Sequence, residues 1–363
     1  MHIKKIKLNN FRNYNEQEIN LNKNINIFYG DNGEGKTNII EAIFLCSIGK
    51  SFRTSKDKEL IKFEKESASI YLEYERKDRD GKIKIDINDK KDIFINGIKI
   101  KKLSELLGKI NVVIFSPDDI QILKEGPHKR RRFLDIMISQ LRPSYLYNLN
   151  MYNKTLEQRN NYLKQIKIEN KNQEMLEIWD EKLAEYAVII YNYRVEFINK
   201  IKNKIENIHK DITQNKENIK IEYISECKEK EEFLNLLKQR RKLDIIKGFT
   251  TKGIHRDDFM IYINEKEVST YGSQGQHRTA ILSLKLSELK VIYDEIGEYP
   301  ILLLDDFMSE LDESRRKSFL ENIENIQVII TCTEKIMLEN LNFVLYNVVS
   351  GDIKHTETKG KEV

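Results

Sequence analysis

Cysteine and proline are scarce in this 363-residue sequence, which contains 3 Cys and 4 Pro. Cys46, Cys227 and Cys332 lie far apart and lack C-x-x-C spacing, which excludes a disulfide framework and argues against a zinc site. No apolar run approaches the roughly 20 residues that span a bilayer, and the chain begins without a signal-peptide pattern. We therefore predict a cytoplasmic protein with no membrane partner.

The sequence also lacks a large excess of positive or negative residues. Lys and Arg number 62 against 58 Asp and Glu, so the formal net charge is only +4 although a third of the residues are charged. Bulk charge therefore identifies no partner, and only local clusters of charge carry information.

Glycine is absent between His128 and Lys247, and Pro143 is the only proline there. Helices require that these breakers be missing, and apolar residues recur at helical spacing through this region, as in the series Trp179, Leu183, Tyr186 and Ile190. We predict a mostly helical insert. One strand is expected within it, because residues 219–223 alternate apolar and polar side chains.

Alternation of the same kind occurs in residues 3–29, 70–74 and 83–87. Each pattern is typical of a strand with one buried face, and Asn96-Gly97 is typical of a hairpin turn. An antiparallel sheet is therefore expected outside the helical insert.

Residues 30–37 read GDNGEGKT and match G-x-x-x-x-G-K-[ST], the phosphate-binding P-loop, with an apolar run before it and a helical pattern after it. Its glycines allow successive N–H groups to turn toward a polyanion at a helix N-terminus. Lys36 is expected to hold the β- and γ-phosphates of ATP, and Thr37 to offer a hydroxyl to Mg²⁺. The predicted nucleotide-binding residues are Gly30, Asp31, Asn32, Gly33, Glu34, Gly35, Lys36 and Thr37.

Residues 301–306 read ILLLDD, a buried strand that ends in two carboxylates. After a P-loop this pattern is typical of a Walker B strand. Asp305 is expected to hold Mg²⁺ together with Thr37, and Asp306 to orient or deprotonate the attacking water. Asp306 and Lys36 are therefore the predicted catalytic residues.

A second phosphate-facing helix is expected after Tyr271-Gly272, where the chain reads SQGQHR. Ser273 and Gln276 have the spacing of a capping box, and Leu282, Leu286 and Leu289 form a helical stripe.

Two runs of cations lie in the helical insert, one near its start and one near its end. The first predicts a DNA contact and consists of Lys129, Arg130, Arg131 and Arg132, since adjacent cations repel one another unless a polyanion compensates. The second, Lys238 with Arg240, Arg241 and Lys242, is equally typical of a solvated helix face. Arg12 is either a surface residue or one that reaches the nucleotide, and sequence alone leaves both open.

In this order, residues 30–37, 271–276, 301–306 and 309–312 look like the Walker A, signature, Walker B and D-loop of an ABC-type ATPase. Within that class the chain resembles the RecF family of bacterial recombination and gap-repair proteins along nearly its whole length. The similar stretches are LNNFRNY (8–14), residues 31–53, residues 115–135, GIHRDDF (253–259), SQGQHR (273–278) and DDFMSELD (305–312).

The resemblance implies an α/β fold: an ABC-type P-loop ATPase head, with a mixed sheet, helices and an antiparallel β-subdomain, and a mostly helical second lobe. The expected boundaries are 1–120 for the first part of the head, 121–247 for the helical lobe and 248–363 for the rest of the head. It also implies ATP-dependent homodimerisation, in which each subunit contacts the nucleotide of its partner through Ser273, Gln274, Gly275 and Gln276.

The implied function is DNA binding, on single-stranded and gapped or junction duplex DNA, with RecO and RecR as partners in loading RecA. Replication restart and SOS induction belong to the same role. The resemblance also implies an ATPase that DNA stimulates. Two departures from the ABC pattern suggest that its hydrolysis is slow: residues 327–333 end without a switch histidine, and Asp306 stands where many ABC proteins have Glu.

Three other functions compete with this interpretation. An ATPase subunit of a transporter, or of another DNA-maintenance complex, would share the four motifs, but the long insert argues against a transporter. A structural protein with an inactive nucleotide site would have no reason to keep Lys36, Thr37 and Asp305 together. A metal-dependent nuclease could use His255, Asp257 and Asp258, although three such residues in one turn more often make local structural contacts.

Overall fold

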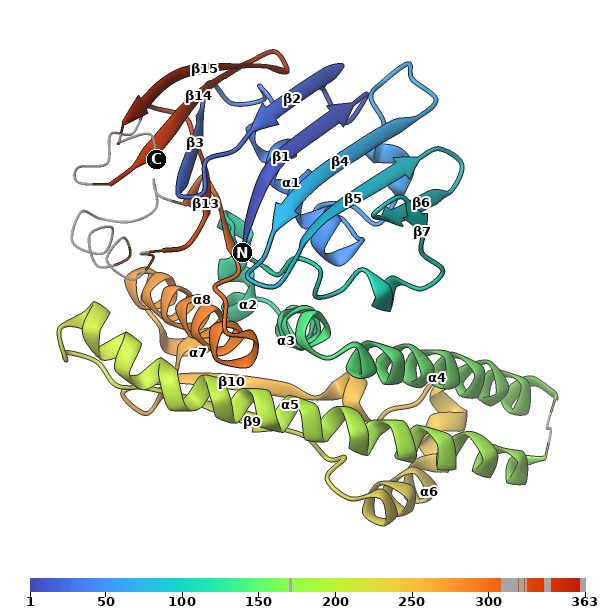
Figure 1. Cartoon of the computed structure of the whole chain (residues 1–363). Coiled ribbons are helices and arrows are strands. Elements are labelled where there is room, and N and C mark those ends of the chain that lie inside the picture. Colours follow the sequence, from blue (N-terminus) through green and yellow to red (C-terminus); the bar gives the residue numbers. More distant parts are fainter. Residues whose placement is uncertain (170–171, 308–318, 320–322, 324, 336–340, 360–363) are drawn as a thin grey trace. The chain divides into compact units, whose positions relative to one another are not determined.

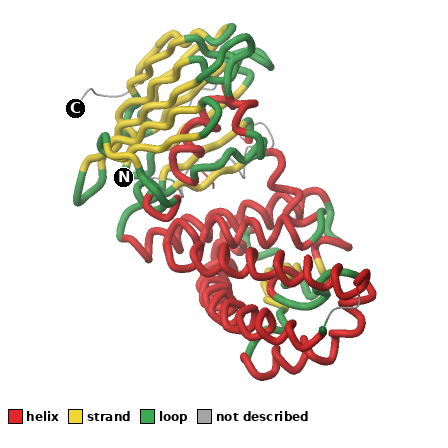
Figure 2. The backbone as a smooth tube through the Cα atoms, turned by 90° about the vertical axis from the view of Figure 1, so that its right-hand side faces the viewer, coloured by secondary structure: helices red, strands yellow, loops and turns green. Residues whose placement is uncertain are grey.

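The computed structural model describes residues 1–169, 172–307, 319, 323, 325–335 and 341–359 (Figure 1). By its internal packing the chain forms two units, a head unit of Met1–Asp119 with Lys285–Val363 and a helical unit of Ile120–Leu284. Most strands belong to the head unit and most helices to the helical unit, as the yellow and red segments of Figure 2 show. Among the described residues, no helix is long and apolar enough to cross a membrane.

The boundary expected between residues 247 and 248 lies elsewhere in the structure, because residues 248–284 belong to the helical unit. Strand β9 (Ile219–Ile224) pairs antiparallel with β10 (Asp258–Ile263), and β11 (Lys266–Glu267) completes a three-stranded sheet. This pairing places the segment after residue 247 in the same sheet as β9, which precedes that residue. Helix α8 (Gln274–Ile296) begins in the helical unit and ends in the head unit.

The helical unit is built mainly on two long helices that pack against each other, α4 (Pro143–Glu169) and α5 (Leu176–Thr213). Helix α6 (Lys230–Lys247) packs on both of them and ends at Gly248, which has φ 73°. The shorter helices are α2 (Gln121–Lys124), α3 (Pro127–Leu141) and α7 (Val268–Tyr271). The predicted helical insert and its single strand are both present.

One sheet of the head unit is antiparallel, with strand order β2-β1-β4-β5-β6-β7. Alternate side chains of β4 and β5 are buried, as their sequences predict. Asn96 and Gly97, both with positive φ, form the turn between β6 and β7. The strands are β1 (His2–Asn9), β2 (Glu16–Asn20), β4 (Ala68–Glu75), β5 (Asp80–Ile87), β6 (Lys91–Ile95) and β7 (Ile98–Lys99).

The other sheet of the head unit has the order β15-β14-β3-β13-β12-β8, in which neighbouring strands are parallel except for β15. Its strands are β3 (Ile25–Tyr29), β8 (Val112–Phe115), β12 (Ile301–Asp305), β13 (Val328–Cys332), β14 (Phe343–Val349) and β15 (Asp352–Lys359). Because β3 and β12 are parallel and flank β13, their carboxyl ends reach the same edge of the sheet. Ligands of open α/β sheets bind at that edge.

Helix α1 (Lys36–Ile48) contacts strands of both sheets of the head unit, among them β4 and β12. It is therefore buried on nearly all sides, which explains why its sequence is apolar around most of its circumference. Gly49, with φ 72°, ends it by donating its N–H to the Leu45 carbonyl at 2.8 Å. Short 3-10 turns lie at Asp57–Leu60, Leu103–Glu105, Pro117–Ile120, Gln173–Met175 and Ile254–Arg256.

Candidate functional site

The loop between β3 and α1 has the backbone of a phosphate cradle. Gly30, Gly33 and Gly35 have φ values of 155°, 88° and 114°. A Cβ on Gly30 would lie 2.2 Å from the Val348 carbonyl oxygen, and one on Gly35 would lie 2.5 Å from the Asn13 side chain. Glycine is thus required at both positions by contact as well as by conformation.

Lys36 lies in the first turn of α1, where a P-loop lysine is expected. Its side chain is largely buried, and Nζ donates to the carbonyl oxygens of Gly30 and Asp31 at 2.6 and 2.7 Å. The loop therefore folds back over its own ammonium group, which concentrates positive charge beside the N-terminus of α1. That arrangement favours a polyanion such as a nucleotide phosphate.

Two segments remote in sequence support the P-loop. Asn13 Nδ2 donates to the Glu34 carbonyl at 2.7 Å, and the Tyr14 hydroxyl donates to the Gly35 carbonyl at 2.9 Å. Gly351 donates its N–H to the same Glu34 carbonyl at 3.2 Å. Burial raises the pKa of Tyr14, so its hydroxyl stays a donor at neutral pH. Sequence reasoning singled out the segment around Asn13 and Tyr14 but missed this supporting role.

Arg12 is bound to a buried acid rather than reaching into the P-loop. Its Nε and Nη2 atoms donate to the two carboxylate oxygens of Glu41, at 2.9 and 2.7 Å, and Nη1 donates to the Glu59 carbonyl at 2.7 Å. Glu41 lies fully buried on α1 and also accepts from Ser51 at 2.5 Å. This fork-to-fork pair compensates the carboxylate that α1 buries between the sheets.

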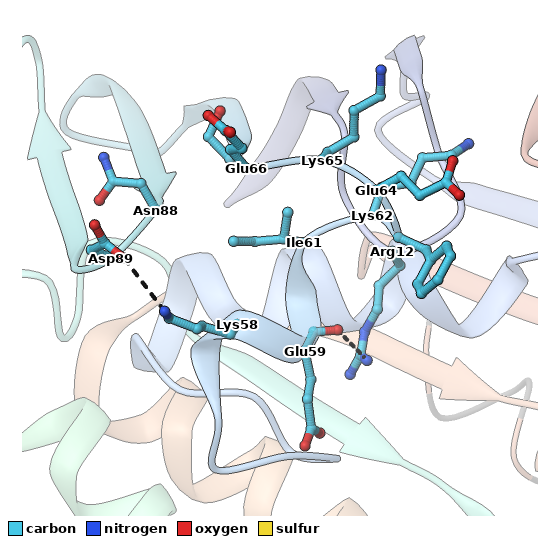
Figure 3. A pocket seen from close by; sticks show the side chains of 12 residues that line it. Arg12, Lys58, Glu59, Ile61, Lys62, Glu64, Lys65, Glu66, Asn88 and Asp89 are labelled. Atoms are coloured by element: carbon cyan, nitrogen blue, oxygen red, sulfur yellow. Dashed lines mark hydrogen bonds and ion pairs between the residues drawn. The ribbon is translucent and has the colours of Figure 1, made fainter.

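Figure 3 shows the pocket beside Arg12, which the 58–67 segment lines together with Asn88 and Asp89. Four cations line it, Arg12, Lys58, Lys62 and Lys65, and four anions, Glu59, Glu64, Glu66 and Asp89. The balance of charge does not favour a nucleotide there. None of the P-loop residues lines this pocket, so the candidate site remains the edge of the parallel sheet.

Asp305 ends β12 directly beside the P-loop helix. The Thr37 hydroxyl donates to Asp305 Oδ1 at 2.7 Å, and the Thr331 hydroxyl donates to the same oxygen at 2.8 Å. Burial raises the pKa of Asp305, while the hydrogen bonds from Thr37 and Thr331 and the nearby Arg53 charge oppose that shift. A hydroxyl and a carboxylate in contact match the oxygen ligands that Mg²⁺ prefers, so the pair fits the predicted metal role.

Asp306 follows with φ 50°, a left-handed conformation that Asp and Asn tolerate better than most residues. Its N–H donates to both the carbonyl and the hydroxyl oxygen of Thr331, each at 3.1 Å. Thr331 on β13 therefore fixes both acidic residues, a role that sequence reasoning missed. The predicted D-loop, residues 309–312, lies outside the described residues.

The predicted capping box at the start of α8 is confirmed. Ser273 N–H donates to Gln276 Oε1 at 3.0 Å, and Gln276 N–H donates to Ser273 Oγ at 3.2 Å. Ser273 and Gln274 are exposed, with Gly275 and Gln276 partly so. The helical unit thus presents a capped helix N-terminus to solvent, whereas the P-loop belongs to the head unit.

The run of cations from Lys129 to Arg132 does not form one exposed surface. Arg130 is buried and donates from Nε and Nη2 to Asp258 at 2.6 and 2.8 Å, and Arg131 donates to the Asp257 carbonyl at 2.8 Å. Only Arg132 of the four is exposed, while Lys129 and Arg131 are partly exposed. Successive residues of a helix point about 100° apart, so the prediction is wrong for Arg130, which serves the fold of the helical unit.

The side chains of the GIHRDDF segment (253–259) likewise make structural contacts. His255 Nδ1 lies 2.8 Å from the Tyr152 hydroxyl and Nε2 lies 3.1 Å from the Thr250 carbonyl, while burial lowers the pKa of His255 to about 4. Asp257 accepts from Tyr223 at 2.5 Å, and Asp258 pairs with Arg130. In the part of the chain that the structure describes, no group of three His, Cys, Asp or Glu residues could hold a metal ion. The contacts of His255, Asp257 and Asp258 favour the structural role for this segment.

Comparison with known proteins agrees with this geometry. The family model of the RecF/RecN/SMC N-terminal domain matches residues 2–356. The DNA replication and repair protein RecF of Clostridium perfringens (strain SM101) is 47% identical to the chain. The aligned region covers 98% of this chain and all of the relative. A solved structure of the recombination mediator protein RecF with ATP in the RecFOR pathway is 40% identical, with a TM-score of 0.92 over 98% of both chains.

A solved SMC head bound to the C-terminal winged-helix domain of ScpA is only 17% identical but has a TM-score of 0.59, which shows a shared fold. Together, the parallel sheet, the P-loop and the Walker B strand define an ABC-type P-loop ATPase head with a helical lobe. The chain belongs to the RecF family of DNA replication and repair proteins. This assignment excludes the transporter subunit considered above.

Proposed function

We propose that the chain is an ATP-driven switch of recombinational gap repair, in which ATP binding with Mg²⁺ produces a homodimer on DNA and slow hydrolysis releases it. The observation that best supports this proposal is the 2.7 Å contact of Thr37 with Asp305 beside the Lys36 ammonium group. The contact joins the P-loop to the Walker B strand, so the residues proposed to bind the phosphates and Mg²⁺ lie together in the head unit.

In this proposal the P-loop amides and Lys36 would bind the β- and γ-phosphates, and Thr37 and Asp305 would hold Mg²⁺, which would neutralise negative charge on the phosphates. Asp306 orients the attacking water and accepts its proton. Its carboxylate is one methylene shorter than that of Glu, which accounts for a weak ATPase. Hydrolysis then acts as the reset of a binding switch rather than as a source of rapid turnover.

Ser273, Gln274, Gly275 and Gln276 are proposed to bind the nucleotide of a second copy of the chain. Each of the two helix N-termini, at Gly35 and at Ser273, carries a partial positive charge of about half a unit. In a symmetric dimer the contacts are self-complementary, so two nucleotides would join two copies.

The proposed DNA partners are single-stranded DNA and gapped or junction duplexes, which would stimulate the ATPase. By analogy with the relative of the RecFOR pathway, the chain would act in the cytoplasm with RecO and RecR to load RecA, in gap repair, replication restart and SOS induction.

Asp306→Asn is expected to retain ATP but to lower its turnover at least about 100-fold, because an amide cannot accept the proton of water. The fold should survive, since the Asp306 contacts to Thr331 use its backbone N–H and Asn tolerates φ 50°. Phosphate release is measured with and without gapped duplex DNA. Wild type should be stimulated by the DNA, and the variant should remain inactive in both conditions.

Turnover of Asp306→Asn at the wild-type rate would place the catalytic carboxylate elsewhere. Absence of any ATPase in the wild type, with or without DNA, would contradict the switch. Asp305→Asn is the matched comparison, since it should lose the dependence of ATP binding on Mg²⁺ that Asp306→Asn keeps.

DNA binding provides a separate test on α3. Arg132→Ala and Lys129→Ala should each lower the slope of log affinity against log salt by about 0.9 on a duplex if the side chain contacts one phosphate. Arg130→Ala should instead lower the free energy of unfolding by about 3 kcal/mol, because it leaves the Asp258 carboxylate unpaired. Arg240→Ala is the control, because Arg240 is an exposed residue of α6. A slope changed by Arg240→Ala alone would move the DNA surface to α6.

A further inference from the structure

The turn between α5 and β9 contacts the first turn of α8 through Glu217. Gln276 Nε2 donates to Glu217 Oε1 at 2.9 Å, while Gln276 Oε1 accepts the Ser273 N–H. A side-chain amide has one donor end and one acceptor end. By accepting from the donor end, Glu217 determines that the acceptor end faces Ser273.

A buried histidine lies behind Glu217. His209, on α5, is inaccessible to solvent, with Nε2 at 3.4 Å from Glu217 Oε2 and Nδ1 at 2.9 Å from Ser283 Oγ. The Ser283 hydroxyl also donates to the Thr279 carbonyl at 2.8 Å. Through Ser283, His209 contacts the third turn of α8, and it in turn limits where the Glu217 carboxylate can lie.

We propose that Glu217 is a positioning residue for the signature segment, which orients Gln276, and through it Ser273, toward the nucleotide held by a second copy of the chain. This inference rests on the proposed function. Ser273 Oγ already accepts the Gln276 N–H, so its own hydrogen can point to a phosphate oxygen. With the amide reversed, the NH₂ group of Gln276 would meet the Ser273 N–H, and two donors would face each other.

Glu217 is not itself a phosphate ligand, because its carboxylate would repel one. It is only about one-fifth exposed, and its two oxygens face Gln276 and His209. Its effect on the nucleotide is therefore indirect, through the geometry of the helix N-terminus. Loss of a hydrogen bond to a charged group typically weakens an equilibrium that depends on it by about tenfold.

Glu217→Ala should leave ATP binding by the monomer unchanged and raise the ATP concentration needed for half-maximal dimerisation about tenfold. Equilibrium nucleotide binding and sedimentation velocity at graded ATP with Mg²⁺ measure the two quantities separately. A purely structural role would lower the melting temperature and weaken both together. Glu217→Gln should behave nearly as wild type, because its amide oxygen can still accept from Gln276 Nε2.

Glu222→Ala is the matched control, since Glu222 is an exposed glutamate of the adjacent strand β9. The inference is overturned if wild type dimerises with ATP and Glu217→Ala dimerises at the same midpoint, or if Glu217→Gln is as impaired as Glu217→Ala. A wild-type protein that stays monomeric at saturating ATP would instead overturn the proposed function, and this inference with it.

Discussion

Replacement of Lys36 by alanine is expected to abolish ATP binding while the protein stays folded. In the proposed site the ammonium group would supply charge-assisted hydrogen bonds to the β- and γ-phosphates, each of which contributes about 1.5–3 kcal/mol. Loss of two such bonds corresponds to an affinity lower by at least about 100-fold. Isothermal titration with ATP and Mg²⁺ measures the loss directly.

The fold should tolerate this change, because the partners of Lys36 Nζ are the Gly30 and Asp31 carbonyls of a surface loop rather than core groups. Lys50→Ala is the matched control, since Lys50 is exposed just beyond the other end of α1. Wild-type affinity of Lys36→Ala for ATP would refute the P-loop assignment. Loss of the cooperative melting transition would show instead that Lys36 is needed for folding.

The P-loop and the Walker B strand could be predicted from sequence because each is a local pattern with a local cause. The glycines of residues 30–35 are required by backbone conformation, and four apolar residues before Asp305 are required by a strand buried on both faces. The capping box at Ser273 is local in the same sense. In each case the residues that make the pattern are the residues that make the contact.

The supporting contacts could not be predicted, because they join residues distant in sequence. Tyr14 supports Gly35, and Thr331 supports both Asp305 and Asp306, through hydrogen bonds that exist only after the sheet has formed. The boundary expected after Lys247 was misplaced for a related reason. The glycine-free stretch ends at Lys247, but pairing of β9 with β10 carries the helical unit on to Leu284.

The DNA contact predicted for the run from Lys129 to Arg132 is wrong at Arg130 because of helix geometry. A count of adjacent cations ignores that α3 turns each successive side chain in a different direction, so neighbours in sequence have different surroundings. The apparent excess of positive charge is already compensated at Arg130 by Asp258, which lies 128 positions further along the chain. A helical projection of residues 127–141 would have placed Arg130 on the same side as buried Phe133 and Leu134.

In the proposed dimer the signature at Ser273 acts on the nucleotide of a second copy of the chain. Ser273→Arg should block this contact, because a bulky side chain would occupy the space of the opposing phosphates. ATP binding by the monomer should survive, since the P-loop belongs to the head unit and is untouched. Ser273→Ala, which loses the hydroxyl cap without adding bulk, separates the loss of the cap from the steric block.

Sedimentation velocity with ATP and Mg²⁺, beside equilibrium ATP binding, tests this claim most directly. The account predicts a wild-type dimer, a weakened dimer for Ser273→Ala, and a Ser273→Arg monomer that binds ATP with wild-type affinity. A Ser273→Arg protein that dimerises as well as wild type, or one that has lost ATP binding as a monomer, would contradict it.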